Sequence, residues 1–146
     1  MLIPHGALIL VVDGKHMRLW RNHGSEAAPA LSLVEEQDQK NPPSRAMATD
    51  GPGRSFESAT PGSSTYPAAD YHQRREDAFG AESLDRLEAV LGSDGSAILV
   101  APPHMLGVLR GRVDKHLRPQ IIAEIAADMT KASAPELLRL LSHHRD

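Results

Sequence analysis

A chain of 146 residues with a formal net charge of −3 and no cysteine is long enough for one domain, and it excludes disulfide bonds, thiolate metal sites and cysteine nucleophiles. The small negative charge gives no overall attraction to nucleic acid or to an anionic membrane, so either kind of binding needs a local patch. The apolar run near the start, Ala7 to Val12, is far shorter than the ~18 residues that span a bilayer, and no signal-peptide pattern accompanies it. We therefore expect a cytoplasmic protein without membrane contact.

Three antiparallel strands are predicted at the start of the chain. Residues 7–12, ALILVV, contain no polar side chain and end in Asp13-Gly14, a dipeptide typical of hairpin turns because both positions accept positive φ. Residues 16–22, HMRLWRN, show the period of two expected of a strand with one buried face. ALSLVEE, residues 30–36, follows as the third strand. The first of the three is expected in the centre of the sheet, since its apolar run is unbroken.

A long loop rich in proline and glycine is predicted over residues 37–70. Segments of this length without regular structure are uncommon in compact domains and are usually functional or disordered. The middle of the loop, DGPGRSFES over residues 50–58, places a cation beside two glycines. Such a turn suits an anion that approaches the backbone, and it equally suits a mobile connector.

A helix is predicted from Asp70 to Leu91. Asp70 and Gln73 resemble a capping box at its start, and Gly92 marks its end. Its first turns are wholly polar, so we expect this front half to project from the domain. The back half has an apolar face at helical spacing and is expected to pack against the core, through Phe79, Leu84, Leu87 and Leu91.

A short buried strand and a second helix are predicted next. AILVA, residues 97–101, is the strand, and Pro102-Pro103 ends it. Residues 104–117 carry an apolar side chain every four positions and are predicted to form one helix. Gly107 and Gly111 lie on a neighbouring line of that helix, where they are expected to allow a close approach to the sheet.

The end of the chain is predicted to form a strand and a last helix. Residues 121–129 fit a helix by spacing and a strand by their β-branched content, and we favour the strand. Ser133 and Glu136 form a capping box around Pro135, which predicts the start of the last helix.

These elements predict an α/β fold of the ribonuclease H-like type in a single domain over residues 1–146. Three meandering strands followed by right-handed crossovers give a mixed five-stranded sheet in the order 3-2-1-4-5, with the first three strands antiparallel and helices covering the sheet.

Metal-dependent chemistry is not indicated by the residues. A two-metal nuclease needs converging carboxylates, but the strand over 97–101 ends in Ala-Pro-Pro, and Asp13 is better explained as the hairpin residue. The eight histidines are scattered without the i, i+4 spacing of a zinc site on a helix. No G-x-S-x-G elbow is present. We expect neither a metal site nor a cofactor.

Two groups of residues are candidates for binding. The first is the tip of the long loop, with Asp50, Gly51, Pro52, Gly53, Arg54 and Ser55. The second comprises six cations that could contact phosphate: Arg74, Arg75, Arg110, Arg112, Lys115 and Arg118. For the four between residues 110 and 118, a solvated helix face is the alternative.

Four separated segments resemble the bacterial host-attachment protein family over nearly the full chain: VVDGKHMRLW, DGPGRSF, LVAPPHMLGVLR and EIAADMT. The resemblance implies a relation to the middle domain of archaeo-eukaryotic peptide-release factors, which has the same sheet order and carries a Gly-Gly-Gln loop between its third strand and a long helix. It places Gly51 to Arg54 where a release factor presents its tip to peptidyl-tRNA. No glutamine follows these glycines, and the codon-reading and factor-binding domains are absent.

The expected function is that of a non-enzymatic RNA- or ribosome-binding module, with the ribosome or tRNA as partner, that contributes indirectly to attachment to host cells. One alternative is a hydrolase that acts on an ester or phosphodiester at the loop. The other is a protein–protein adaptor.

Overall fold

The computed structural model describes residues 1–39 and 68–144. The strand and the helix that flank the predicted loop are both longer than expected, because Gln37 and Asp38 belong to the third strand and the helix begins at Ala68. In chain order, the elements of the described residues are β1 (Leu8–Val12), β2 (His16–Asn22), β3 (Leu31–Asp38), α2 (Ala68–Leu91), β4 (Ala97–Ala101), α3 (Pro103–Arg112), the 3-10 turn η2 (Arg118–Gln120), β5 (Ile121–Ala126) and α4 (Ala134–His143).

The strands form one mixed sheet in the order β3-β2-β1-β4-β5. β1 pairs antiparallel with β2 and β2 with β3, while β1–β4 and β4–β5 are parallel. This arrangement confirms the predicted α/β class and strand order. Every residue of β1 and β4 is buried, because these central strands have neighbours on both sides and helices on both faces, which explains their unbroken apolar sequences.

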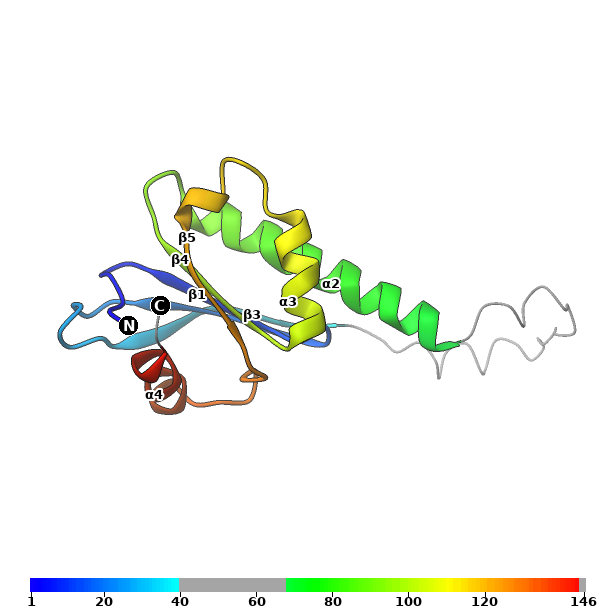
Figure 1. Cartoon of the computed structure of the whole chain (residues 1–146). Coiled ribbons are helices and arrows are strands. Elements are labelled where there is room, and N and C mark those ends of the chain that lie inside the picture. Colours follow the sequence, from blue (N-terminus) through cyan, green and yellow to red (C-terminus); the bar gives the residue numbers. More distant parts are fainter. Residues whose placement is uncertain (40–67, 145–146) are drawn as a thin grey trace, which may run out of the picture.

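Helices cover both faces of the sheet (Figure 1). α2 and α3 pack on one face, where Leu10 of β1 and Leu99 of β4 lie in the same core as Leu87 and Leu109. α4 packs on the other face against Ile9 and Ile98, which belong to a second core. Alternate residues of each central strand thus pack into the cores on opposite faces of the sheet, as the period of two requires.

The β1–β2 hairpin is fixed by its aspartate and glycine. Gly14 has a φ of +97°, a conformation that favours glycine. Asp13 Oδ1 accepts hydrogen bonds from the backbone N–H groups of Lys15 (2.9 Å) and His16 (2.8 Å). Its other carboxylate oxygen accepts from the hydroxyl of buried Thr130 at 2.9 Å. Asp13 is therefore a structural turn residue, as its sequence context predicts.

The N-terminal cap predicted for α2 is wrong. Asp70 lies within the first turn, and the Gln73 amide donates to Asp77 at 2.9 Å. Ala68 and Ala69 are strong helix formers, so the helix extends past Asp70 toward its N-terminus. The buried face of the back half is confirmed at Phe79, Leu84, Leu87 and Leu91, and the helix ends before Gly92, with a φ of +75°.

α3 ends at Arg112 and does not continue to residue 117, so the predicted last turn of this helix is wrong. Val113 is extended, and Asp114 Oδ1 accepts from the N–H groups of His116 and Leu117, both at 2.9 Å. The hydrogen bond from Leu117 N–H is the main cause that lowers the pKa of the Asp114 carboxyl. A short polar side chain thus replaces the helix by a turn.

The expected close approach of Gly107 and Gly111 to the sheet is also wrong. Both residues are exposed, and a Cβ placed on either would meet nothing within 4 Å. The close approach occurs instead at Gly80 of α2, where a Cβ would overlap with Sδ of Met105 on α3. The glycine that allows a close approach is therefore Gly80, and it lies between α2 and α3, not between a helix and the sheet.

The predicted end of the chain is confirmed. Residues 121–126 form the edge strand β5, and α4 starts with the predicted capping box. Glu136 N–H donates to Ser133 Oγ at 3.3 Å, and Ser133 N–H donates to Glu136 Oε1 at 2.8 Å. This hydrogen bond from Ser133 N–H is the largest of the causes that lower the pKa of Glu136.

Candidate functional site

The predicted loop-tip residues lie outside the described residues, and their assignment as a site stays a prediction; they are Asp50, Gly51, Pro52, Gly53, Arg54 and Ser55. The two ends from which this segment departs are described. Gln39 follows β3, and Ala68 begins α2. The front half of α2 extends beyond the sheet (Figure 1), as its polar sequence predicts.

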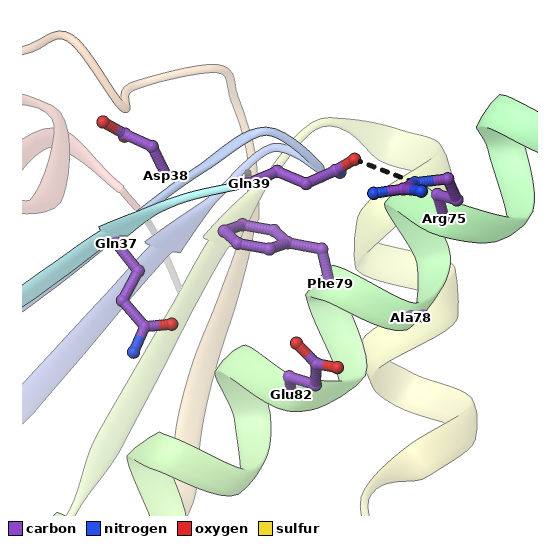
Figure 2. A pocket seen from close by; sticks show the side chains of 7 residues that line it. All are labelled: Gln37, Asp38, Gln39, Arg75, Ala78, Phe79 and Glu82. Atoms are coloured by element: carbon purple, nitrogen blue, oxygen red, sulfur yellow. Dashed lines mark hydrogen bonds between the residues drawn. The ribbon is translucent and has the colours of Figure 1, made fainter. Parts of the chain in front are cut away.

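A groove of about 690 Å³ lies between the end of β3 and the flank of α2 (Figure 2). The α2 positions that line it have the spacing i, i+3, i+4, i+7, so they form one stripe along the helix. The last two residues of β3 and the residue after it form the opposite wall, with the side chain of Asp38 directed away from α2 (Figure 2). The lining residues are Gln37, Asp38 and Gln39 on the strand side and Arg75, Ala78, Phe79 and Glu82 on the helix side.

Gln39 closes one end of the groove. Its amide Nε2 donates to the carbonyl of Gly14 at 2.6 Å, and its Oε1 accepts from Arg75 Nε at 3.4 Å (Figure 2). Arg75 also donates to the hydroxyl of Tyr71 at 3.4 Å, and its guanidinium lies 5.8 Å from the centre of the Tyr71 ring. One glutamine therefore ties the end of β3 to the hairpin and to α2.

An ion pair joins β3 and α2 beyond the other end of the groove. Arg86 donates two hydrogen bonds to the carboxylate of Glu35, at 2.8 and 3.1 Å. The hydrogen bond to Glu35 is the main cause that raises the pKa of Arg86. Because Glu35 pairs with Arg86 and Gln39 with Arg75, β3 and α2 run in opposite directions along the groove.

The predicted cations separate into two places. Arg75 lines the groove, and Arg74 is exposed next to it on α2. The other four lie on α3 and on the segment that follows it, where none of them lines the groove: Arg110, Arg112, Lys115 and Arg118. Of the six predicted cations, Arg75 thus lines the groove and Arg74 lies beside it, while the role of all six as phosphate contacts stays a prediction.

Three of those four cations contact groups of their own chain. Arg110 pairs with Glu124 of β5, and Arg112 lies 3.5 Å from a carboxylate oxygen of Asp85. Arg118 Nη2 donates to the carbonyls of Arg110 (3.5 Å) and Val113 (3.4 Å), near the C-terminus of α3. Within the described residues, Lys115 alone among the four has no such contact. The expected basic helix face is therefore an interrupted patch around a turn.

The part of the chain that the structure describes contains no cluster of potential metal ligands. No group of three or more His, Asp or Glu side chains in residues 1–39 and 68–144 could hold a metal ion. A second cavity of about 540 Å³ lies between the β1–β2 hairpin and the start of α4, with Asp13, Lys15, Asp128 and Lys131 among its lining residues. Its mixed charges do not define one ligand.

Sequence reasoning missed the groove residues other than Arg75. The spacing of Arg75, Ala78, Phe79 and Glu82 could have indicated one helix stripe, but no local pattern shows that the end of β3 lies opposite it. Gln37 and Gln39 were assigned to the loop. Their role in the groove depends on the crossover that brings α2 back along β3.

A comparison with protein families identifies the family of this chain. The family model described as "Protein required for attachment to host cells" matches residues 8–141, which covers β1 to α4 almost completely. No curated protein matches the chain. In the described residues, no helix combines the length and the apolar character needed to cross a membrane.

Proposed function

Since the chain belongs to the family of proteins required for attachment to host cells, we propose that it serves attachment from the cytoplasm as a non-enzymatic module that binds RNA or the ribosome. The binding residues would be the Gly-Pro-Gly-Arg tip at 51–54 and the two cations near the start of α2, Arg74 and Arg75. In chain order the tip stands between the third strand and a long helix, and the resemblance of this order to release-factor middle domains supports the proposal.

The observation that carries the proposal is the projecting front half of α2. Residues 70–74 are exposed on this half, and it bears Arg74 and Arg75 close to where the segment with the Gly-Pro-Gly-Arg tip returns to the fold. Arginine binds phosphate oxygens in a bidentate geometry. The arginines near the start of α2 and Arg54 at the tip could therefore contact the phosphate backbone of one RNA molecule. Such contacts need no catalytic group.

The test is co-sedimentation of the protein with purified ribosomes over a series of salt concentrations. Arg54→Ala and Arg74→Ala should each weaken binding and lower the salt slope by about one, as expected for one lost phosphate contact. Arg86→Ala is the control, because its guanidinium is held by Glu35. Equal binding by wild type, Arg54→Ala and Arg74→Ala would reject the proposal, and turnover of peptidyl-tRNA that is lost in Arg54→Ala would favour a hydrolase.

A protein–protein adaptor is the second candidate. The groove between β3 and α2 favours it, because one carboxylate, Glu82, and one guanidinium, Arg75, line the groove. The side chain of Asp38 points away from α2 (Figure 2), and its carboxylate contacts His16 at 2.9 Å. The opposite charges of Glu82 and Arg75 leave the groove without a net attraction for phosphate. The groove therefore suits a polypeptide better than a nucleic acid.

A further inference from the structure

The groove has a strand edge as one wall and a helix stripe as the other. β3 is the last strand on its side of the sheet, so no strand of the described residues pairs with its outer edge. A register shift in the β2–β3 ladder leaves Val34 without a paired residue on β2, but regular pairing with β2 resumes from Glu35 to Asp38. As far as the described part of the chain goes, the end of β3 therefore has a regular edge without a strand partner beside α2, which is the arrangement that accepts an extended peptide.

The length of the groove limits what it can hold. The helix wall runs from Arg75 to Glu82, a rise of about 10 Å at 1.5 Å per residue. An extended chain advances about 3.3 Å per residue, so about three residues fit along this wall. A contact of this size is expected to be weak and reversible.

The chemistry changes along the groove. Ala78 and the edge of Phe79, which is 7% exposed, supply its apolar part. Glu82 is exposed, and no described residue forms an ion pair or hydrogen bond with its carboxylate. The amide of Gln37, on the opposite wall, is likewise without a partner among the described residues and points into the groove region (Figure 2).

We infer that this groove binds an extended segment of a partner protein that carries an apolar residue next to a lysine or arginine. The apolar side chain lies over Phe79 and Ala78, and the cation meets the carboxylate of Glu82. The backbone of the segment runs beside the open end of β3, near Gln37. This inference develops the adaptor candidate, and it stands or falls independently of RNA binding at the loop.

The test is a charge reversal in the groove, read by a display library of random ten-residue peptides. Peptides selected on wild type should share an apolar residue followed or preceded by Lys or Arg. Selection on Glu82→Lys should replace those basic positions by Asp or Glu, because the groove then presents the opposite charge. Glu88→Lys is the matched control, since Glu88 is an exposed acid on the same helix that does not line the groove.

Affinity gives the second measurement. A peptide selected on wild type, labelled and followed by fluorescence anisotropy, should bind Glu82→Lys about five-fold more weakly, because the reversal removes one exposed charge pair and adds a repulsion between like charges. Glu88→Lys should bind within about two-fold of wild type. Circular dichroism and a thermal melt of both variants exclude unfolding as the cause.

Three results would overturn the inference. They are a selection without any shared basic position, a selected charge that does not change in Glu82→Lys, and an equal loss of binding in Glu88→Lys. A labelled oligouridylate that binds Glu82→Lys more tightly than wild type, while no peptide motif emerges, would assign the groove to RNA instead. Loss of ribosome binding in Arg54→Ala affects none of these results, so the failure of either proposal can be recognised separately.

Discussion

The two halves of α2 differ in almost every physical respect, although one continuous helix forms both. The back half buries Phe79, Leu84 and Leu87 against the sheet and α3. The front half is largely exposed, and its contacts with the body are polar, such as Asp77 with His104 of α3 at 3.0 Å. The back half therefore stabilises the fold, and the front half leaves most of its side chains exposed.

The comparison teaches that the front half depends on the back half. A helix shorter than about 12 residues is marginal in water, because nucleation is unfavourable and few hydrogen bonds follow. The front turns avoid this cost because they extend a helix that packing already holds in place. Their side chains can then be polar, so the sequence of this half can change while the fold remains stable.

The largest expected effect is the loss of a buried side chain in the back half. Leu87 is fully buried (0% exposed), so Leu87→Ala removes apolar contacts and leaves a cavity. We expect a loss of about 3 kcal/mol in the free energy of unfolding, measured by urea denaturation. His72→Ala in the front half is the control, with an expected change below about 0.5 kcal/mol. Similar losses in the two variants would remove the distinction between the halves.

Gly80 tests the boundary between the halves. In Gly80→Ala the new Cβ would meet Sδ of Met105 in a packed interface, since Met105 is only 3% exposed. We expect a net loss of about 1 kcal/mol, because overpacking outweighs the gain in helix propensity. Thermal or urea unfolding measures this difference.

The double variant identifies the cause of that loss. In a Met105→Ala background the same Gly80→Ala change should become stabilising by about 0.5 to 1 kcal/mol, since only the propensity gain remains. A loss of equal size in both backgrounds would show that the two residues are not in conflict.

Much of the fold could be predicted because its signals are local. The unbroken apolar runs of β1 and β4 indicate strands buried on both faces, and the Asp13-Gly14 hairpin and the α4 capping box fix two chain reversals. The error at the end of α3 arose because a single side chain competes with a periodic pattern. Val113 and Leu117 are buried at helical spacing, but Asp114 accepts the N–H groups that a helix would need.

The candidate site was less predictable, because it is made by tertiary contacts. Arg75 could be named from its charge, but Gln37, Phe79 and Glu82 come together only after α2 crosses back along β3. Gly107 was given the role that belongs to Gly80, since a sequence does not show which glycine faces a neighbouring helix. The roles of residues 50–55 stay predictions.

The smallest expected effect concerns an aromatic residue of the front half. Tyr71 is 42% exposed, and its contacts to Arg75 are at 3.4 Å and 5.8 Å, so Tyr71→Ala should change the free energy of unfolding by less than about 0.5 kcal/mol. Phe79→Ala, eight positions further along the same helix and buried, should cost about 3 kcal/mol. Both values come from urea denaturation under the same conditions.

The pair is informative because both variants remove an aromatic ring from one helix. Helix propensity changes little between them, so the difference measures packing alone. A loss above about 1 kcal/mol in Tyr71→Ala would mean that the front half is held by packing of its own. In that case its exposed side chains would be part of the stabilising structure, and a polar front face would no longer indicate a surface reserved for binding.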